Sequence, residues 1–184
     1  MVRTRMAPED RRLLILRAAA DMFQKHGFGA ASIDAIAVAS GITGPGIYRY
    51  FRSKTDLIIA LIDMAASQAE DALADRLLEN GVSVSAMADV LVDAALREGA
   101  VIGLLQASVA EMDDSDRKRL EAVRNGLVSR LGQTLTSARA DLDSKDAALN
   151  VQAALAIVGQ VGRKAFPVAD RARLVALIEA VLSA

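Results

Sequence analysis

The sequence predicts an all-α protein of about nine helices, and three observations lead to this prediction. Apolar residues make up 53% of the 184 residues and aromatic residues only 3%. Alanine, leucine and valine dominate, and alanine and leucine lose little conformational entropy in a helix. No segment alternates apolar and polar residues as strands do; apolar side chains recur at spacings of three and four. We expect an N-terminal domain over residues 1–57 and a larger one over 58–184.

The first helix is expected to begin at Pro8, because the two acids that follow it suit the positive end of a helix dipole. Gly27 can adopt a left-handed conformation and is expected to end this helix, with His26 near the cap. Between them runs one apolar stripe with spacings of three, four and three: Leu13, Leu16, Ala20 and Phe23.

Two short helices follow. Ser32 is expected to cap the first, which Gly41 ends after about two turns. Thr43 is expected to cap the second, with Pro45 in its first turn and an end near Phe51. Two short helices joined by a tight glycine-containing turn describe a helix-turn-helix over about residues 32–51, whose second helix enters the DNA major groove.

The remainder is expected to be helical as well. A long helix begins at Ser53 or Thr55 and runs to about Leu78. The uncharged run 147–162 is shorter than the roughly 20 apolar residues of a membrane span, so we interpret it as a buried helix. The other expected helices are 84–98, 100–111, 115–140, 144–165 and 170–183.

Charge is divided unevenly along the chain. Residues 1–57 hold nine lysines and arginines and five aspartates and glutamates, a net charge of +4, while residues 58–184 hold −5. A basic first third indicates an anionic partner for that part.

The composition also argues against several functions. Cysteine is absent, which excludes disulfides and thiolate metal sites and fits a cytoplasmic protein. A single histidine forms neither a metal cluster nor a triad. No nucleophile, base and oxyanion donor come together, so we expect no enzyme, no cofactor and no metal.

Several side chains of the helix-turn-helix are candidates for DNA contact. Glycines at the start of its second helix let backbone N–H groups approach DNA, while tyrosine and threonine hydroxyls can bond phosphate oxygens. The alternatives are ordinary packing for the tyrosines, a solvated side chain for Arg49, and pairing with Asp56 for Lys54. The candidates are Ser32, Thr43, Gly44, Pro45, Gly46, Tyr48, Arg49, Tyr50 and Lys54.

The segment "SIDAIAVASGITGPGIYRYFRSKTDL", residues 32–57, resembles the DNA-binding signature of TetR-type transcriptional regulators. The pattern A-x-x-x-G-[VI]-[ST] matches residues 37–43, and [LI]-Y-x-[YH]-F-x-[ST]-K-x-x-L matches residues 47–57. The family often carries lysine where Gly44 stands and threonine or serine where Gly46 stands. We therefore expect base reading by Pro45, Tyr48, Arg49 and Tyr50.

The last two helices are candidates for pairing in a homodimer, because the run 147–162 is apolar on nearly every side. The alternative is a buried helix of the chain's own core. TetR-type dimers pair through the same two helices of each subunit. The resemblance therefore implies this pairing for the present chain. The expected interface residues are Val151, Leu155, Val158, Gly159, Gly162, Leu174, Leu177, Ile178 and Val181.

The resemblance further implies a ligand cavity in the larger domain. We expect an apolar or amphipathic small-molecule effector that releases a repressor from DNA. The alternatives are an activator, or a helical interaction module without small-molecule control. The candidate pocket residues are Met64, Met87, Leu91, Leu105, Val109 and Met112.

Overall fold

The computed structural model describes residues 6–81, 83–109, 112–162 and 170–184, with only the backbone for residues 77, 79–80, 98–108 and 162. These ranges contain helices and no strand, which confirms the all-α class. The helices are α1 (Pro8–Ala30), α2 (Ile33–Ala39), α3 (Gly44–Ile47), α4 (Lys54–Asn80), α5 (Val84–Ser108), α6 (Asp114–Ala138), α7 (Ser144–Gly162) and α8 (Arg171–Leu182).

Two expected boundaries differ from the structure. The helices expected over 84–98 and 100–111 form one helix, α5, because the glycine expected to separate them, Gly99, costs only about 1 kcal/mol and tertiary packing outweighs this cost. The described part of the chain therefore has eight helices rather than nine. The helix expected to reach Phe51 ends at Ile47, and a turn follows it.

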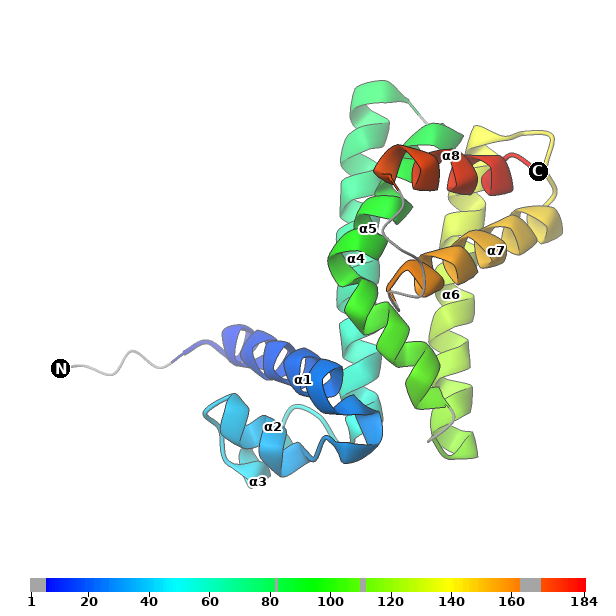
Figure 1. Cartoon of the computed structure of the whole chain (residues 1–184). Helices are drawn as coiled ribbons and strands as arrows, with labels where there is room; N and C mark the ends of the chain where they lie inside the picture. Colours follow the sequence, from blue (N-terminus) through cyan, green and yellow to red (C-terminus); the bar gives the residue numbers. More distant parts are fainter. Residues whose placement is uncertain (1–5, 82, 110–111, 163–169) are drawn as a thin grey trace.

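Helices α1, α2 and α3 form a small lobe at one end of α4, called the headpiece below (Figure 1). The two glycines expected to end helices have positive φ angles, 77° for Gly27 and 66° for Gly41. A side chain there would be strained even though a Cβ would meet no atom within 4 Å. Gly27 lies within the bounds of α1, but its φ of 77° and ψ of 168° are non-helical and kink the chain there, while Gly41 follows the end of α2; the expected helix breaks at both glycines are therefore confirmed.

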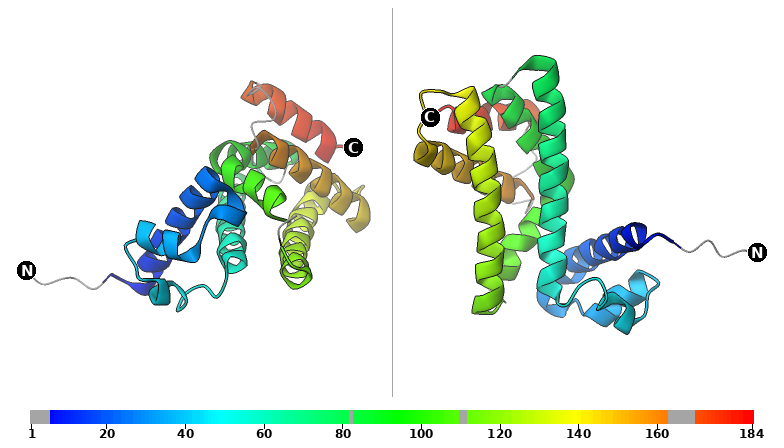
Figure 2. Two further views of the ribbon diagram at one scale, coloured as in Figure 1. Left: turned by 60° about the horizontal axis from the view of Figure 1, so that its bottom comes forward. Right: turned by 180° about the vertical axis from the view of Figure 1, so that it is seen from behind.

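Beyond the headpiece, α4 and α6 run lengthwise while α7 and α8 cross them (Figures 1 and 2). Helix α5 is the central element, since it packs against α1, α4, α7 and α8. No described helix is long and apolar enough to cross a membrane.

The buried apolar side chains form two cores. The headpiece core joins α1–α3 to the first part of α4 and to residues at the start of α6, with Leu57 and Leu120 among its members. The body core joins Leu73 of α4 to α5, α6, α7 and α8. Helix α4 runs through residue 57 without a break, so the division into 1–57 and 58–184 stays a prediction.

The start of α4 is held by reciprocal capping. The Ser53 hydroxyl accepts a hydrogen bond from the Asp56 N–H at 3.1 Å, and Asp56 Oδ2 accepts one from the Arg52 N–H at 2.9 Å. Ser53 is therefore the N-cap of α4, which was one of the two expected starts of this helix. The same turn binds α6: Arg119 Nη2 lies 2.5 Å from Asp56 Oδ1, and the Thr55 hydroxyl donates to Asp116 Oδ2.

Asp56 is the central acceptor of this junction. Its burial alone would raise the pKa of the carboxyl, but hydrogen bonds and charge from Arg119 and the Arg52 N–H outweigh burial and lower the pKa. The charged form is thus favoured in the folded state, and its stabilisation is lost as the pH falls through the lowered pKa.

We expect Asp56→Asn to reduce the free energy of unfolding by about 1–2 kcal/mol at pH 7, because two donors lose a charged acceptor while the half-exposed Arg119 is screened. The difference should begin to shrink as the pH falls below the ordinary carboxyl pKa of about 3.9 and should vanish only once the pH has passed the lowered pKa of the folded protein. Urea unfolding at several pH values measures it. Asp63→Asn, at an exposed position on α4, is the matched control; equal loss in both variants would contradict the assigned role of Asp56.

Candidate nucleic-acid interface

The turn between α2 and α3 is closed by hydrogen bonds. Ser40 is 4% exposed, and its hydroxyl donates to the Ile36 and Ala37 carbonyls at 2.8 and 3.0 Å. The Ile42 N–H donates to the Ala37 carbonyl at 2.9 Å, which turns the chain toward α3. The two helices and this turn have the arrangement of a helix-turn-helix.

The two predicted N-caps differ. The Ser32 hydroxyl accepts from the Ala35 N–H at 3.0 Å, as expected. Thr43 occupies the N-cap position of α3, but only its carbonyl bonds the helix, accepting from the N–H groups of Gly46 and Ile47. The exposed Thr43 hydroxyl caps no backbone N–H, which corrects the expected side-chain cap and leaves this hydroxyl available to a ligand.

The glycines of α3 have close side-chain neighbours within the headpiece. A Cβ on Gly44 would lie 2.6 Å from Oδ1 of Asp34, and one on Gly46 would lie 2.6 Å from Cγ2 of Ile42. The sequence analysis attributed both glycines to close approach of DNA and missed these contacts. It also assigned no site role to Asp34. The position of this residue in the first turn of α2 was the feature of the sequence that could have indicated such a role.

The candidate side chains differ in exposure. Tyr48 is 55% exposed, and Pro45 and Arg49 are also exposed. Tyr50 is half-buried and packs against the headpiece core. The structure therefore leaves Tyr48 and Arg49 more accessible to a ligand than Tyr50.

Lys54 connects the start of α4 to the end of α1. Its Nζ donates to the carbonyls of Phe28 and Gly29 at 2.8 and 3.2 Å and lies 4.6 Å from the centroid of the Phe28 ring. The pairing of Lys54 with Asp56, one of the expected alternatives, is not formed, because Asp56 pairs with Arg119.

A cation of α1 reaches the turn that follows α3. The Arg12 guanidinium lies 5.1 Å from the centroid of the Phe51 ring. A cation over an aromatic face is attracted by the ring quadrupole. Arg12 near the start of α1 contacts Phe51, and Lys54 contacts the end of α1, so both cations connect α1 to the segments on either side of α3. Sequence reasoning missed the role of Arg12.

The expected pocket residues do not meet in one place. Met64, Val109 and Met112 belong to or pack against the headpiece core, while Met87 and Leu91 lie in the body core. The side chain of Leu105 lies outside the described part of the structure.

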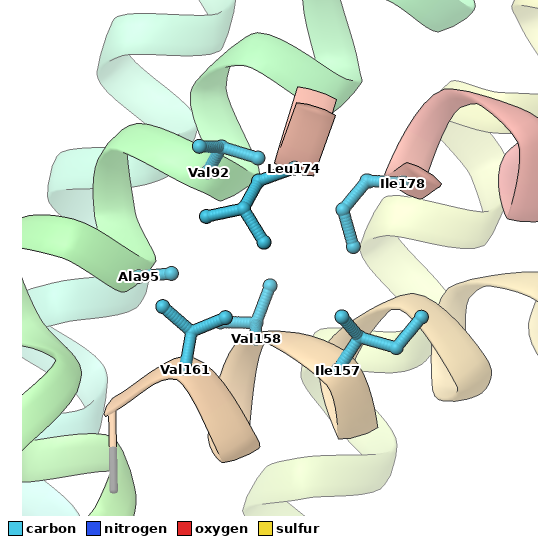
Figure 3. Close-up of a pocket in the computed structure, with 7 residues that line it drawn as sticks. All are labelled: Val92, Ala95, Ile157, Val158, Val161, Leu174 and Ile178. Atoms are coloured by element: carbon cyan, nitrogen blue, oxygen red, sulfur yellow. The ribbon is translucent and has the colours of Figure 1, made fainter. Parts of the chain in front are cut away.

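A different set of side chains lines a small apolar cavity between α5, α7 and α8 (Figure 3). It has about 180 Å³ of empty space, part of it continuous with solvent. Its lining residues are Val92, Ala95, Ile157, Val158, Val161, Leu174 and Ile178.

Most of the expected dimer residues face inward. Five are buried within the chain's own body, because α7 and α8 turn these sides toward α5: Val151, Val158, Gly159, Leu174 and Ile178. Leu155 and Val181 are half-buried, Leu177 is 48% exposed, and the surroundings of Gly162 are not described.

The outward sides of the same helices carry other apolar residues. Leu149 is 63% exposed, and exposed alanines follow it on α7 and flank Leu177 on α8. Sequence reasoning named Leu177 of this face but missed Leu149, because the periodicity of α7 does not say which side of the helix meets α5.

No group of three acidic or histidine side chains among the described residues could hold a metal ion.

Residues 15–61 match the model of the family described as bacterial regulatory proteins, tetR family. The HTH-type transcriptional regulator EthR of Mycobacterium tuberculosis is 36% identical over 76 residues, which cover 41% of this chain and 35% of that protein. The chain thus spans about a third of the length of the curated relatives it matches.

Solved structures share the whole fold. The structure of the "putative TetR-family transcriptional regulator from Rhodococcus sp." has a TM-score of 0.73 at 21% identity, over 95% of this chain and 99% of that one. AibR, solved in complex with isovaleryl coenzyme A and operator DNA, has a TM-score of 0.64 at 16% identity, over 92% and 96%. Residues 15–61 of this chain are thus similar in sequence to the tetR family of bacterial regulatory proteins, and its helices share the fold of solved regulators of that family.

Proposed function

We propose that the protein is a homodimeric transcriptional repressor that binds double-stranded DNA through α3 and is released by an apolar or amphipathic small molecule. The observation that carries this proposal is the exposed helix-turn-helix on a basic headpiece, with Tyr48, Arg49 and the Thr43 hydroxyl facing solvent. Its fold relative AibR was solved on operator DNA, which agrees with the same use of the fold.

The proposed contacts divide by chemistry. The Tyr48 and Thr43 hydroxyls donate to phosphate oxygens, and Ser32, whose oxygen accepts from Ala35, still has its own proton to donate. Arg49 and Pro45 face base edges in the groove. Lys54 acts by holding α4 against α1, with its remaining N–H directed to phosphate, and the half-buried Tyr50 contributes at the rim.

We expect Tyr48→Phe to weaken DNA binding about fivefold, since one hydrogen bond contributes about 1 kcal/mol, without changing the melting temperature. Fluorescence anisotropy with fragments selected from genomic DNA measures the affinity. Binding should also weaken steeply with salt, because counterions are released from the phosphates.

Each of the two measurements has an outcome that would contradict the proposal. Unchanged affinity of the Phe variant would remove Tyr48 from the interface. Affinity for duplex DNA that neither depends on salt nor prefers a sequence would overturn DNA recognition altogether.

The proposed dimer uses the outward faces of α7 and α8. Leu149 and Leu177 are large, apolar and exposed, and the neighbouring exposed alanines permit close approach of a second pair of helices. Four helices would then meet across a twofold axis. Two headpieces would be presented to half-sites about 34 Å or a multiple of this apart.

We expect Leu149→Glu combined with Leu177→Glu to convert the dimer into a monomer at micromolar concentration, because four carboxylates would be buried in one interface. Sedimentation velocity measures the change. Leu78→Glu is the matched control, since Leu78 is 87% exposed at the far end of α4. A wild-type monomer, or a double variant that still dimerises, would refute this interface.

The apolar cavity between α5, α7 and α8 supports an apolar effector. Its enclosed space, about 10 Å³, is roughly enough for one water molecule, so binding of an effector would have to widen it. An effector that fits the widened state better than the DNA-bound state weakens DNA affinity by that difference. Titration of apolar acids and acyl thioesters into the protein–DNA complex tests release, and an increase in DNA affinity would favour an activator instead.

A further inference from the structure

A carboxylate lies directly against the first residue of α3. Asp34 is exposed on α2, and its Oδ1 lies 2.6 Å from the position that a Cβ on Gly44 would occupy. None of the ion pairs or hydrogen bonds formed among the described residues uses this carboxylate. As far as the described part of the chain goes, both of its oxygens are therefore free to accept from a ligand.

This contact changes which side chain reads DNA at the start of α3. Gly44 has no side chain, and the space that one would use is filled by the carboxylate of Asp34. A base edge that approaches this point meets an acceptor from α2 rather than a donor from α3. The neighbouring contributors are the Thr43 hydroxyl and the Pro45 ring, neither of which is charged.

The chemistry of a carboxylate restricts what it can recognise. It only accepts hydrogen bonds, so it repels phosphate oxygens and the acceptor edges of guanine and thymine. Adenine presents its N6 amino group beside the acceptor N7, whereas cytosine presents the N4 amino group without a neighbouring acceptor. Cytosine is therefore the base that this carboxylate favours.

We infer that Asp34 is a specificity-determining residue of the DNA-binding surface and accepts a hydrogen bond from the N4 amino group of one cytosine in each half-site. The inference rests on the proposed function, because it requires α3 to enter the major groove. It deepens that function by assigning a base preference to a residue of α2.

The experiment is selection from randomised duplexes by the full-length protein and by Asp34→Asn. The wild type should require cytosine at one position of each half-site. Asparagine pairs with adenine N6 and N7, so the variant should shift to adenine at that position and keep the other preferences. Asp21→Asn, at an exposed position of α1 in the same headpiece, makes the same charge change and should keep the cytosine.

Direct binding gives the magnitude. Replacing that cytosine by thymine should weaken wild-type binding about 5- to 100-fold and binding of Asp34→Asn less than twofold. An Asn variant that selects the same base as the wild type overturns the inference. A wild type without salt-dependent binding to any duplex would instead overturn the proposed function, so the two failures are distinguishable.

A second measurement needs no protein variant. N4-methylcytosine keeps its base pair but points its methyl group into the major groove, where it replaces the amino hydrogen. Wild-type affinity should fall as far with this base as with thymine, and undiminished affinity would exclude the contact.

A variant at the neighbouring glycine tests the contact from the other side. Gly44→Ala should displace the carboxylate and lose the same cytosine preference as Asp34→Asn. Retention of that preference by Gly44→Ala would show that the position of the carboxylate against residue 44 does not matter.

Discussion

The shared use of α4 by two apolar cores is the constraint on which the rest of the structure depends. Leu57 and Leu61 at its start lie in the headpiece core, and Leu73 two turns from its end lies in the body core. The capped first turn binds the start of α6 through Asp56 and Thr55. The start of α6 and the headpiece are therefore joined directly through the first turn of α4.

The recognition surface depends on short contacts inside the headpiece. Lys54 and Arg12 hold α1 against the segments that flank α3, so this four-residue helix is positioned by its neighbours rather than by its own hydrogen bonds. The close approach of Asp34 to Gly44 follows from the same packing. Residues of α2 and α3 consequently form one surface, and its charge is set by both helices.

The last two helices bury some of their apolar residues against the chain's own body and expose others. Val158 and Ile178 pack against α5, while Leu149 and Leu177 remain exposed. A helix that is apolar on nearly every side can serve an internal core and a second subunit at once. The alternatives of core helix and pairing helix are therefore compatible for α7, with different residues for each role.

The sequence predicted the all-α class, the helix-turn-helix, the helix breaks at Gly27 and Gly41 and the capping by Ser32, because these depend on local propensity, φ preference and spacing, and for α4 it left Ser53 and Thr55 open. It did not determine the continuity of α5 through Gly99, since packing outweighs a local helix penalty. Three features became known only from the tertiary structure. They are the side of α7 that faces α5, the carbonyls of α1 to which Lys54 donates, and the contact between Asp34 and Gly44. Those outcomes depend on contacts between residues distant in the chain or on either side of a turn, and periodicity carries no information about them.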